Sequence, residues 1–165
     1  MKMFEQKCGF PRIILYSIVT SMIVMCFGCG DGKIGKATMS LPELGITINA
    51  PAGWKFDGRD SGMCTHGDYI GLLLSEPLDG KTFSKAVEAM SKEFGSTVLS
   101  RKDLNIGGRT AVQISMDAPN DMKVLRLYLD CGQSIAYVSY AVSKTDYASY
   151  EQALLESLAS LRIKP

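Results

Sequence analysis

The strongest constraint on the fold of this chain is a row of four strand-like segments joined by short turns between residues 97 and 142. The first two segments alternate apolar and polar residues, which is the pattern of a half-buried β-strand. The segments span residues 97–106, 109–117, 123–130 and 134–142. Gly107 and Gly108 separate the first two, as is typical of a two-residue hairpin. Because tight turns join only antiparallel strands, the sequence predicts a mainly antiparallel sheet.

Shorter strands are expected before this row. Leu44, Ile46 and Ile48 alternate with small or polar neighbours, which predicts one buried strand face. Trp54 and Phe56 restart the alternation after a turn, and a further strand is expected over residues 69–75. Residues 57–68 are rich in Gly, Asp and Ser, and they are therefore expected to form a loop.

Two helices complete the predicted domain. Thr82 is a suitable N-cap for the first, and Gly95 can end it in a left-handed conformation. Its apolar residues recur with helical spacing at Phe83, Val87, Met90 and Phe94. The second is expected to begin near Thr145 or Asp146, with an apolar stripe of Tyr147, Tyr150, Leu154, Leu158 and Leu161. We therefore expect an α+β fold in which both helices pack on one face of the sheet.

The N-terminus has the pattern of a bacterial lipoprotein signal peptide, expected over residues 1–28. Lys2, Lys7 and Arg12 supply a basic start, and an apolar run follows over residues 13–27. Gly28 then precedes Cys29, whose thiol would lie at the new N-terminus after cleavage and could be acylated. The sequence thus predicts lipidation at Cys29. A cleaved signal without a lipid and an uncleaved N-terminal anchor are the alternatives.

This N-terminal pattern predicts the cellular location of the protein. Residues 29–40 are expected to form a flexible tether, and residues 41–165 the folded domain, held on a membrane by its lipid on the extracytoplasmic or periplasmic side of the bacterial envelope. The residues around Cys29 do not distinguish the inner from the outer membrane. From Cys29 onward, 15 Lys and Arg face 16 Asp and Glu, so there is no basic surplus for nucleic-acid binding.

Two motifs of the predicted domain carry a resemblance to a known superfamily. The first is the strand Leu-Gly-Ile-Thr-Ile at residues 44–48, followed by the turn Pro-Ala-Gly-Trp at residues 51–54. The second is the segment Asn-Ile-Gly-Gly-Arg-Thr-Ala at residues 105–111, before a strand. Together with the closing helix, these motifs resemble the PsbP-like and DcrB-like superfamily over nearly the whole domain. The resemblance implies this fold and a non-enzymatic binding or accessory role, without indicating a ligand.

Cys64 and Cys131 are the two cysteines that follow Cys29. Two thiols in an exported domain most economically form a disulfide, which is the pairing we expect. Free thiols are one alternative. A second is a metal site, because Cys64, His66 and Asp68 alternate along a short segment to which Cys131 could add a fourth ligand. A single close-set pair of this kind is a weak metal signature, so no metal or other cofactor is expected.

No catalytic constellation stands out in the sequence. His66 is the sole histidine, and no nucleophile motif accompanies it. Tyr128, Tyr137 and Tyr140 lie on neighbouring predicted strands, where they either form a recognition surface or pack within the domain. The sequence therefore predicts a non-catalytic binding or assembly module with an envelope protein as partner. The alternative is a small-ligand or metal-binding protein that uses the loop over residues 63–68.

Overall fold

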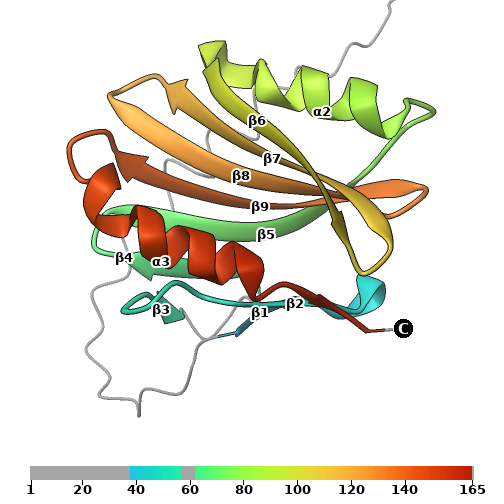
Figure 1. Cartoon of the computed structure of the whole chain (residues 1–165), viewed down its shortest axis with the longest axis horizontal. Coiled ribbons are helices and arrows are strands. Elements are labelled where there is room, and N and C mark those ends of the chain that lie inside the picture. Colours follow the sequence, from blue (N-terminus) through green and yellow to red (C-terminus); the bar gives the residue numbers. More distant parts are fainter. Residues whose placement is uncertain (1–37, 57–61, 165) are drawn as a thin grey trace, which may run out of the picture. The chain divides into compact units, whose positions relative to one another are not determined.

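The computed structural model describes residues 38–56 and 62–164, apart from the side chain of Phe94. The predicted signal peptide, Cys29 and most of the predicted tether lie outside these residues. Where the chain is described it forms an α+β domain with antiparallel strand pairs, which confirms the predicted fold class (Figure 1).

A seven-stranded antiparallel sheet is the main element of the domain. Its strands lie in the order β3-β4-β5-β9-β8-β7-β6. Their bounds are β3 Lys55–Phe56, β4 Met63–His66, β5 Tyr69–Pro77, β6 Thr97–Ile106, β7 Arg109–Ala118, β8 Met122–Asp130 and β9 Ser134–Ser143. The predicted row of four strands corresponds to β6 through β9. Gly107 and Gly108 form the first turn with φ angles of 59° and 82°, a conformation that glycine adopts without strain.

A second sheet of three short strands contains the beginning and the end of the domain. Its order is β1-β2-β10, with β1 Thr38–Leu41, β2 Ile46–Asn49 and β10 Arg162–Ile163. The short 3-10 helix η1 Pro42–Leu44 joins β1 to β2. The expected tether over residues 29–40 is therefore too long at its C-terminal end, because Met39 of β1 is completely buried. Residues 38–40 therefore belong to the folded domain and not to the tether.

The predicted loop over residues 57–68 is also partly wrong. Residues 57–61 lie outside the described part of the chain, but β4 occupies residues 63–66 and pairs along its length with β5. Cys64 of β4 has no exposed surface. The sequence gives little sign of β4 because the strand is short and lies among loop residues. Its buried side chain is a small cysteine, so the alternation of apolar and polar residues is weak.

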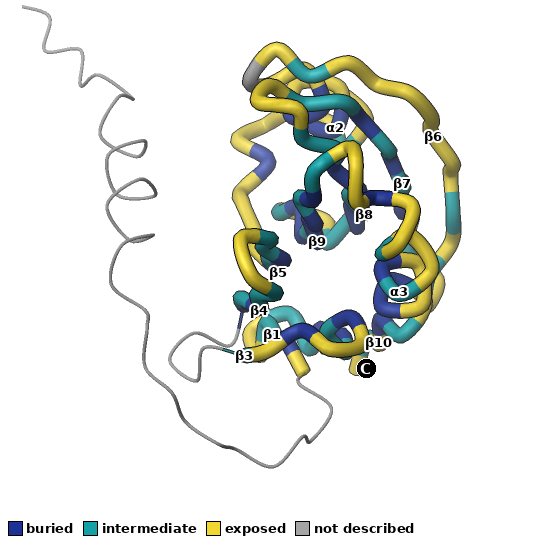
Figure 2. Tube along the Cα trace, turned by 90° about the vertical axis from the view of Figure 1, so that its left-hand side faces the viewer, coloured by how far each residue is buried: buried dark blue, intermediate teal, exposed yellow. Residues whose placement is uncertain are grey.

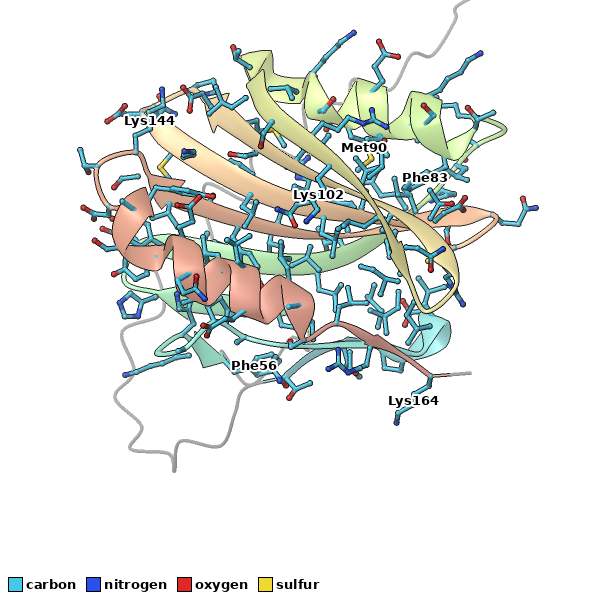
Figure 3. All side chains as sticks on the ribbon, viewed as in Figure 1. Phe56, Phe83, Met90, Lys102, Lys144 and Lys164 are labelled. Carbon is cyan, nitrogen blue, oxygen red and sulfur yellow. The ribbon has the colours of Figure 1, made fainter. Side chains whose placement is uncertain are left out.

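Helix α2 Phe83–Ser91 begins where the sequence predicts. The Oγ1 atom of Thr82 accepts a hydrogen bond from the Lys85 N–H at 3.4 Å, which caps the first turn. Val87 and Met90 are buried against the sheet, and Figure 3 labels Met90 on this face of the helix. A 3-10 turn, η2 Glu93–Gly95, follows, and Gly95 has a φ of 70°. The left-handed glycine lets the chain reverse into β6.

Helix α3 Tyr147–Ala159 buries the stripe that the sequence predicts. Tyr147, Leu154 and Leu158 are at most 5% exposed, and Tyr150 packs at the edge of the same core. Asp146 stands at the N-cap, although its side chain makes no capping hydrogen bond to the helix. The helix is held mainly by the apolar surface that it buries.

The two helices lie on opposite faces of the seven-stranded sheet, so the expectation that both cover one face is wrong. Leu125 and Leu127 of β8 belong to the cluster that contains α3, whereas Val124 and Tyr128 of the same strand belong to the cluster that contains α2. Figure 2 shows α2 and α3 on either side of β8 and β9, whose traces are largely buried. The strands in the middle of the sheet are apolar on both faces because both faces are covered.

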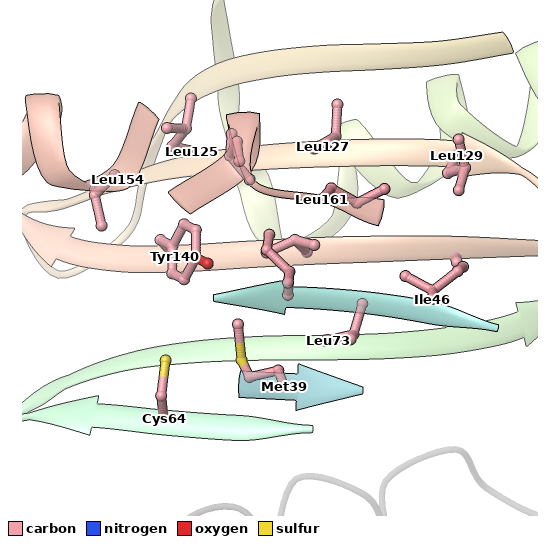
Figure 4. Close-up of a cluster of buried hydrophobic side chains, with 14 of the residues drawn as sticks. Met39, Ile46, Cys64, Leu73, Leu125, Leu127, Leu129, Tyr140, Leu154 and Leu161 are labelled. Atoms are coloured by element: carbon pink, nitrogen blue, oxygen red, sulfur yellow. The ribbon is translucent and has the colours of Figure 1, made fainter. Parts of the chain in front are cut away.

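The larger core lies between the seven-stranded sheet, α3 and the three-stranded sheet (Figure 4). Met39 and Ile46 of the small sheet meet Leu73 and Tyr140 of the large one, and Leu154 closes the cluster from α3. The hydroxyl of Tyr140 donates to Ser157 Oγ at 2.5 Å, and Ser157 Oγ donates to the Asn49 carbonyl at 2.5 Å. This chain of hydrogen bonds joins β9, α3 and β2 inside the core.

Candidate functional site

The structure does not bring Cys64 and Cys131 together, so the predicted disulfide is wrong. Both are free cysteines. The strand register places Cys64 opposite Gly71, Gly71 opposite Tyr140, and Tyr140 opposite Leu125. Cys131 lies six residues beyond Leu125 along the chain, which is about 20 Å for extended strands. A disulfide requires the two Cα atoms to approach within about 7 Å.

The two thiols are expected to differ in reactivity. Burial raises the pKa of the Cys64 thiol to about 12, so at pH 8 this thiol is protonated as well as inaccessible. Cys131 is only half-buried. In the native chain a thiol reagent at pH 8 is expected to modify the peptide that contains Cys131 and to reach Cys64 only in denaturant. Peptide mass mapping without reductant checks this, and a linked Cys64–Cys131 peptide would contradict it.

The predicted metal-binding alternative is not assembled in this structure. Cys64 points into the core, Asp68 lies in an exposed turn, and Cys131 lies at the far end of the sheet. Among the residues that the structure describes, no group of three or more His, Cys, Asp or Glu side chains could hold a metal ion.

His66 packs among aromatic rings and does not face a nucleophile in the described structure. Its ring stacks on Trp54, with 6.2 Å between the centroids, and meets Tyr150 edge-on at 5.4 Å. Its Nδ1 lies 3.1 Å from the Gly53 carbonyl, so Nδ1–H donates there. These contacts fix the ring as part of the packing around the Pro-Ala-Gly-Trp turn.

Two of the three tyrosines named in the sequence pack within the domain. Tyr128 and Tyr140 have no exposed surface, and burial raises the pKa of both hydroxyls. Tyr137 is half-buried and donates to Glu76 Oε1 at 2.9 Å. The guanidinium of Arg126 lies near the Tyr128 and Tyr137 rings and donates to Tyr128 Oη at 3.1 Å. The packing alternative therefore holds for Tyr128 and Tyr140.

The most accessible binding feature is the outer edge of β6. This ten-residue strand ends the seven-stranded sheet, and within the described residues it pairs only with β7. Most of its residues are exposed, including two large apolar side chains, Val98 at 42% and Leu99 at 51%. The register shifts between Val98 and Ser100, so Leu99 stands in a β-bulge. A long edge with unpaired backbone groups can accept a further strand.

The register also shows which backbone groups of β6 point outward. The Gly107 and Gly108 turn closes on the pair Ile106–Arg109, which is a hydrogen-bonded pair in a two-residue hairpin. Hydrogen-bonded pairs then alternate along the ladder, so Leu104 and Lys102 bond to β7. The backbone N–H and C=O groups of Asp103 and Arg101 consequently point away from β7. They form the edge that another strand could join.

A groove of about 520 Å³, lined by both apolar and polar residues, adjoins this strand on its α3-facing side. Leu127 and Gln113 belong to the sheet at this groove, Leu104 and Ile106 line it from β6, and residues from Leu155 to Ile163 line it from α3 and β10. Leu155 is 36% exposed although its neighbour Leu154 is fully buried. Lys102, labelled in Figure 3, shares the α3-facing side of β6 with Leu104.

Comparison with known proteins shows the fold of the domain. No protein-family model and no curated protein matches the chain. Among solved structures, cyanobacterial PsbP (CyanoP) from Synechocystis sp. PCC 6803 superposes with a TM-score of 0.56 at 11% identity, over 84% of this chain and 99% of that one. The domain has the PsbP-like fold. A Pseudomonas aeruginosa protein of unknown function, PA94, described as a putative regulator, gives a TM-score of 0.54 at 16% identity, over 78% and 96% of the two chains.

Sequence reasoning missed both the β6 edge and the groove of this PsbP-like domain. A weak signal existed for each. Val98 and Leu99 are adjacent apolar residues that break the alternation of β6, and Leu155 lies beside the apolar stripe of α3 instead of on it. Neither signal identifies a site until the strand order shows that β6 is an edge and that it lies beside the end of α3.

Proposed function

We propose that this protein is an envelope lipoprotein, anchored to a membrane by acyl chains on Cys29, whose PsbP-like domain is a non-catalytic binding or assembly module. The partner is an envelope protein that adds an extended segment to the edge of β6. The observation that carries the proposal is the long outer edge of β6, which no strand of the described residues pairs with and on which Val98 and Leu99 are exposed. Strand addition uses backbone hydrogen bonds for affinity and exposed side chains for specificity.

Two further observations support the proposal. The basic start, the apolar run and the Gly28–Cys29 pair of the N-terminus are typical of an exported lipoprotein. Within the described residues, Cys64 is buried with a raised pKa, which makes it a poor nucleophile, and the ring of His66 stacks on Trp54 and donates Nδ1–H to the Gly53 carbonyl. Among these residues no helix is long and apolar enough to span a membrane.

The proposal predicts a specific crosslink from β6. A photoreactive amino acid placed at Leu99 of the full chain is expected to capture one protein in envelope membranes, because its side chain lies on the exposed edge. The same amino acid at Lys85, an exposed position of α2, is the control and is expected to yield no such adduct. Immunoblotting and mass spectrometry of the adducts measure both. Matching adduct patterns at Leu99 and Lys85 would contradict docking at β6.

The anchor is tested in the same experiment. Cys29→Ser removes the acylated thiol, so the protein is expected to leave the membrane pellet and the yield of the Leu99 adduct is expected to fall. A Cys29→Ser protein that remains in the pellet to the same extent would refute the lipid anchor. That result would not bear on docking at β6, which the comparison of the Leu99 and Lys85 adducts tests.

A further inference from the structure

The lining of the groove is suited to an alkyl chain. Its apolar side chains are Leu104, Ile106, Leu127, Leu155, Leu158, Ala159, Leu161 and Ile163. The groove is also lined by three polar side chains, those of Asn105, Gln113 and Arg162. Of these, Asn105 Oδ1 already accepts a hydrogen bond from the Gly108 N–H at 3.1 Å. A peptide in this groove would bury backbone N–H and C=O groups with few partners, which is unfavourable. An alkyl chain has no polar groups to satisfy.

Arg162 supplies one oriented positive charge at the end of this groove. Its Nη1 donates to the carbonyls of Ala159 and Leu161 at 3.1 and 2.8 Å, which ties one side of the guanidinium to the end of α3. The opposite side, formed by Nε and Nη2, makes no hydrogen bond or ion pair within the described structure. A guanidinium with this side free matches the two oxygens of a carboxylate. The acidic residues of α3, Glu151 and Glu156, are exposed and do not line the groove.

The size of the groove agrees with a small ligand. Its volume of about 520 Å³ lies within the range of about 300–1,000 Å³ that is usual for small-molecule sites. The single cation and the eight apolar side chains of the lining together describe an amphiphile with one alkyl chain and one anionic end.

We propose that this groove binds a long-chain fatty acid, with the alkyl chain between β6 and α3 and the carboxylate on Nε and Nη2 of Arg162. The site is distinct from the outer edge of β6, where the partner protein is expected. The two proposals can therefore succeed or fail separately, although both concern surfaces to which β6 contributes.

The test uses the full chain in its membrane and a palmitate analogue that carries a photoreactive diazirine on the alkyl chain. Mass spectrometry is expected to find the label in the peptides that contain residues 104–107 and 155–163. Unlabelled palmitate is expected to compete at least about tenfold better than hexadecanol, because the alcohol loses the charge-assisted hydrogen bonds to Arg162. Equal competition by the two compounds would overturn the assigned role of Arg162.

Matched variants separate the groove from general lipid contact. Ala159→Trp fills the groove and is expected to abolish the label, whereas Ala148→Trp, also exposed on α3 but outside the groove, is expected to retain it. Arg162→Met is expected to weaken labelling about tenfold, whereas Lys85→Met, which removes an exposed cation of α2 outside the groove, is not.

Three results would overturn the proposal: labelling that Ala159→Trp does not change, labelling spread evenly over the domain, or a groove occupied by a peptide or a second copy of the chain. If labelling fails while the Leu99 crosslink persists, the binding-module proposal stands without the fatty acid. If the crosslink fails while labelling persists, the fatty-acid site stands without the partner.

Discussion

Replacing Gly71 with alanine is expected to lower the free energy of unfolding by about 3 kcal/mol, because the added methyl group has no room. An ideal Cβ at this position would lie 2.6 Å from Cε1 of the Tyr140 ring and 2.7 Å from Sγ of Cys64. Carbon atoms in a packed core rarely approach within 3.5 Å of their neighbours. Either β4 and β9 must move apart or both side chains must leave their positions.

The Tyr140 ring cannot easily make that move. Its hydroxyl is held by Ser157, which is held in turn by the carbonyl of Asn49, so a shifted ring would break a buried hydrogen-bond chain. Chemical unfolding followed by far-UV circular dichroism measures the effect of Gly71→Ala. Adding Cys64→Ala removes one of the three clashing atoms, the other two being in the Tyr140 ring, so the double variant is expected to lose less stability than the sum of the single losses. A Gly71→Ala protein as stable as the original would show that this contact is misplaced.

Truncating Leu154 to alanine is expected to lower the free energy of unfolding by a similar amount, about 3 kcal/mol. Leu154 is fully buried in the core that joins α3 to both sheets, so truncation leaves a cavity at the centre of the domain. The next residue provides a matched control with the same chemistry. Leu155 is 36% exposed, so Leu155→Ala is expected to change the stability by less than about 1 kcal/mol.

The comparison of Leu154 with Leu155 tests the orientation of α3 directly. Urea unfolding of the two variants gives both values under one set of conditions. Equal losses in the two variants, or a larger loss at Leu155, would mean that the helix is rotated about its axis relative to the structure described. The groove, which depends on Leu155 facing β6, would then be incorrect as well.

The part of the fold that the sequence predicts well is the part that local interactions determine. The turn at Gly107 and Gly108 requires left-handed backbone, and the alternation on either side sets the strand faces, so β6 and β7 follow from about twenty neighbouring residues. Thr82 begins α2 for an equally local reason, because its side chain caps the first turn. The antiparallel class of the sheet follows from the short turns alone.

The errors concern features that depend on distant pairing. Strand β5 pairs with β9 and not with its successor β6, and only this order reveals that Cys64 and Cys131 lie far apart. The placement of α2 and α3 on opposite faces depends on both sides of β8 being buried, and the polar residues on one side of β7 concealed this. The sequence assigns Met39 to the tether, and only its pairing with Ile48 of β2 shows that it belongs to a strand.

The candidate binding surfaces could not be predicted for the same reason. Whether a strand lies at the edge of a sheet depends on the strand order. The sequence of residues 97–106 alone does not show whether another strand pairs with the outer side of β6. The groove requires α3 and β6, which are about fifty residues apart in the chain, to lie close together without closing the space between them.

The most direct test of the central claim, that a partner strand joins the outer edge of β6, is the yield of the Leu99 crosslink in an Arg101→Pro variant. Proline lacks the N–H group that an added strand would need, and Arg101 points its N–H away from β7, so the internal ladder is kept. Arg101→Ala is the control, since it removes the ion pair with Asp103 but retains the N–H. We predict that the adduct is lost in Arg101→Pro and retained in Arg101→Ala, with both proteins folded. An adduct of unchanged yield in a folded Arg101→Pro protein would contradict the account.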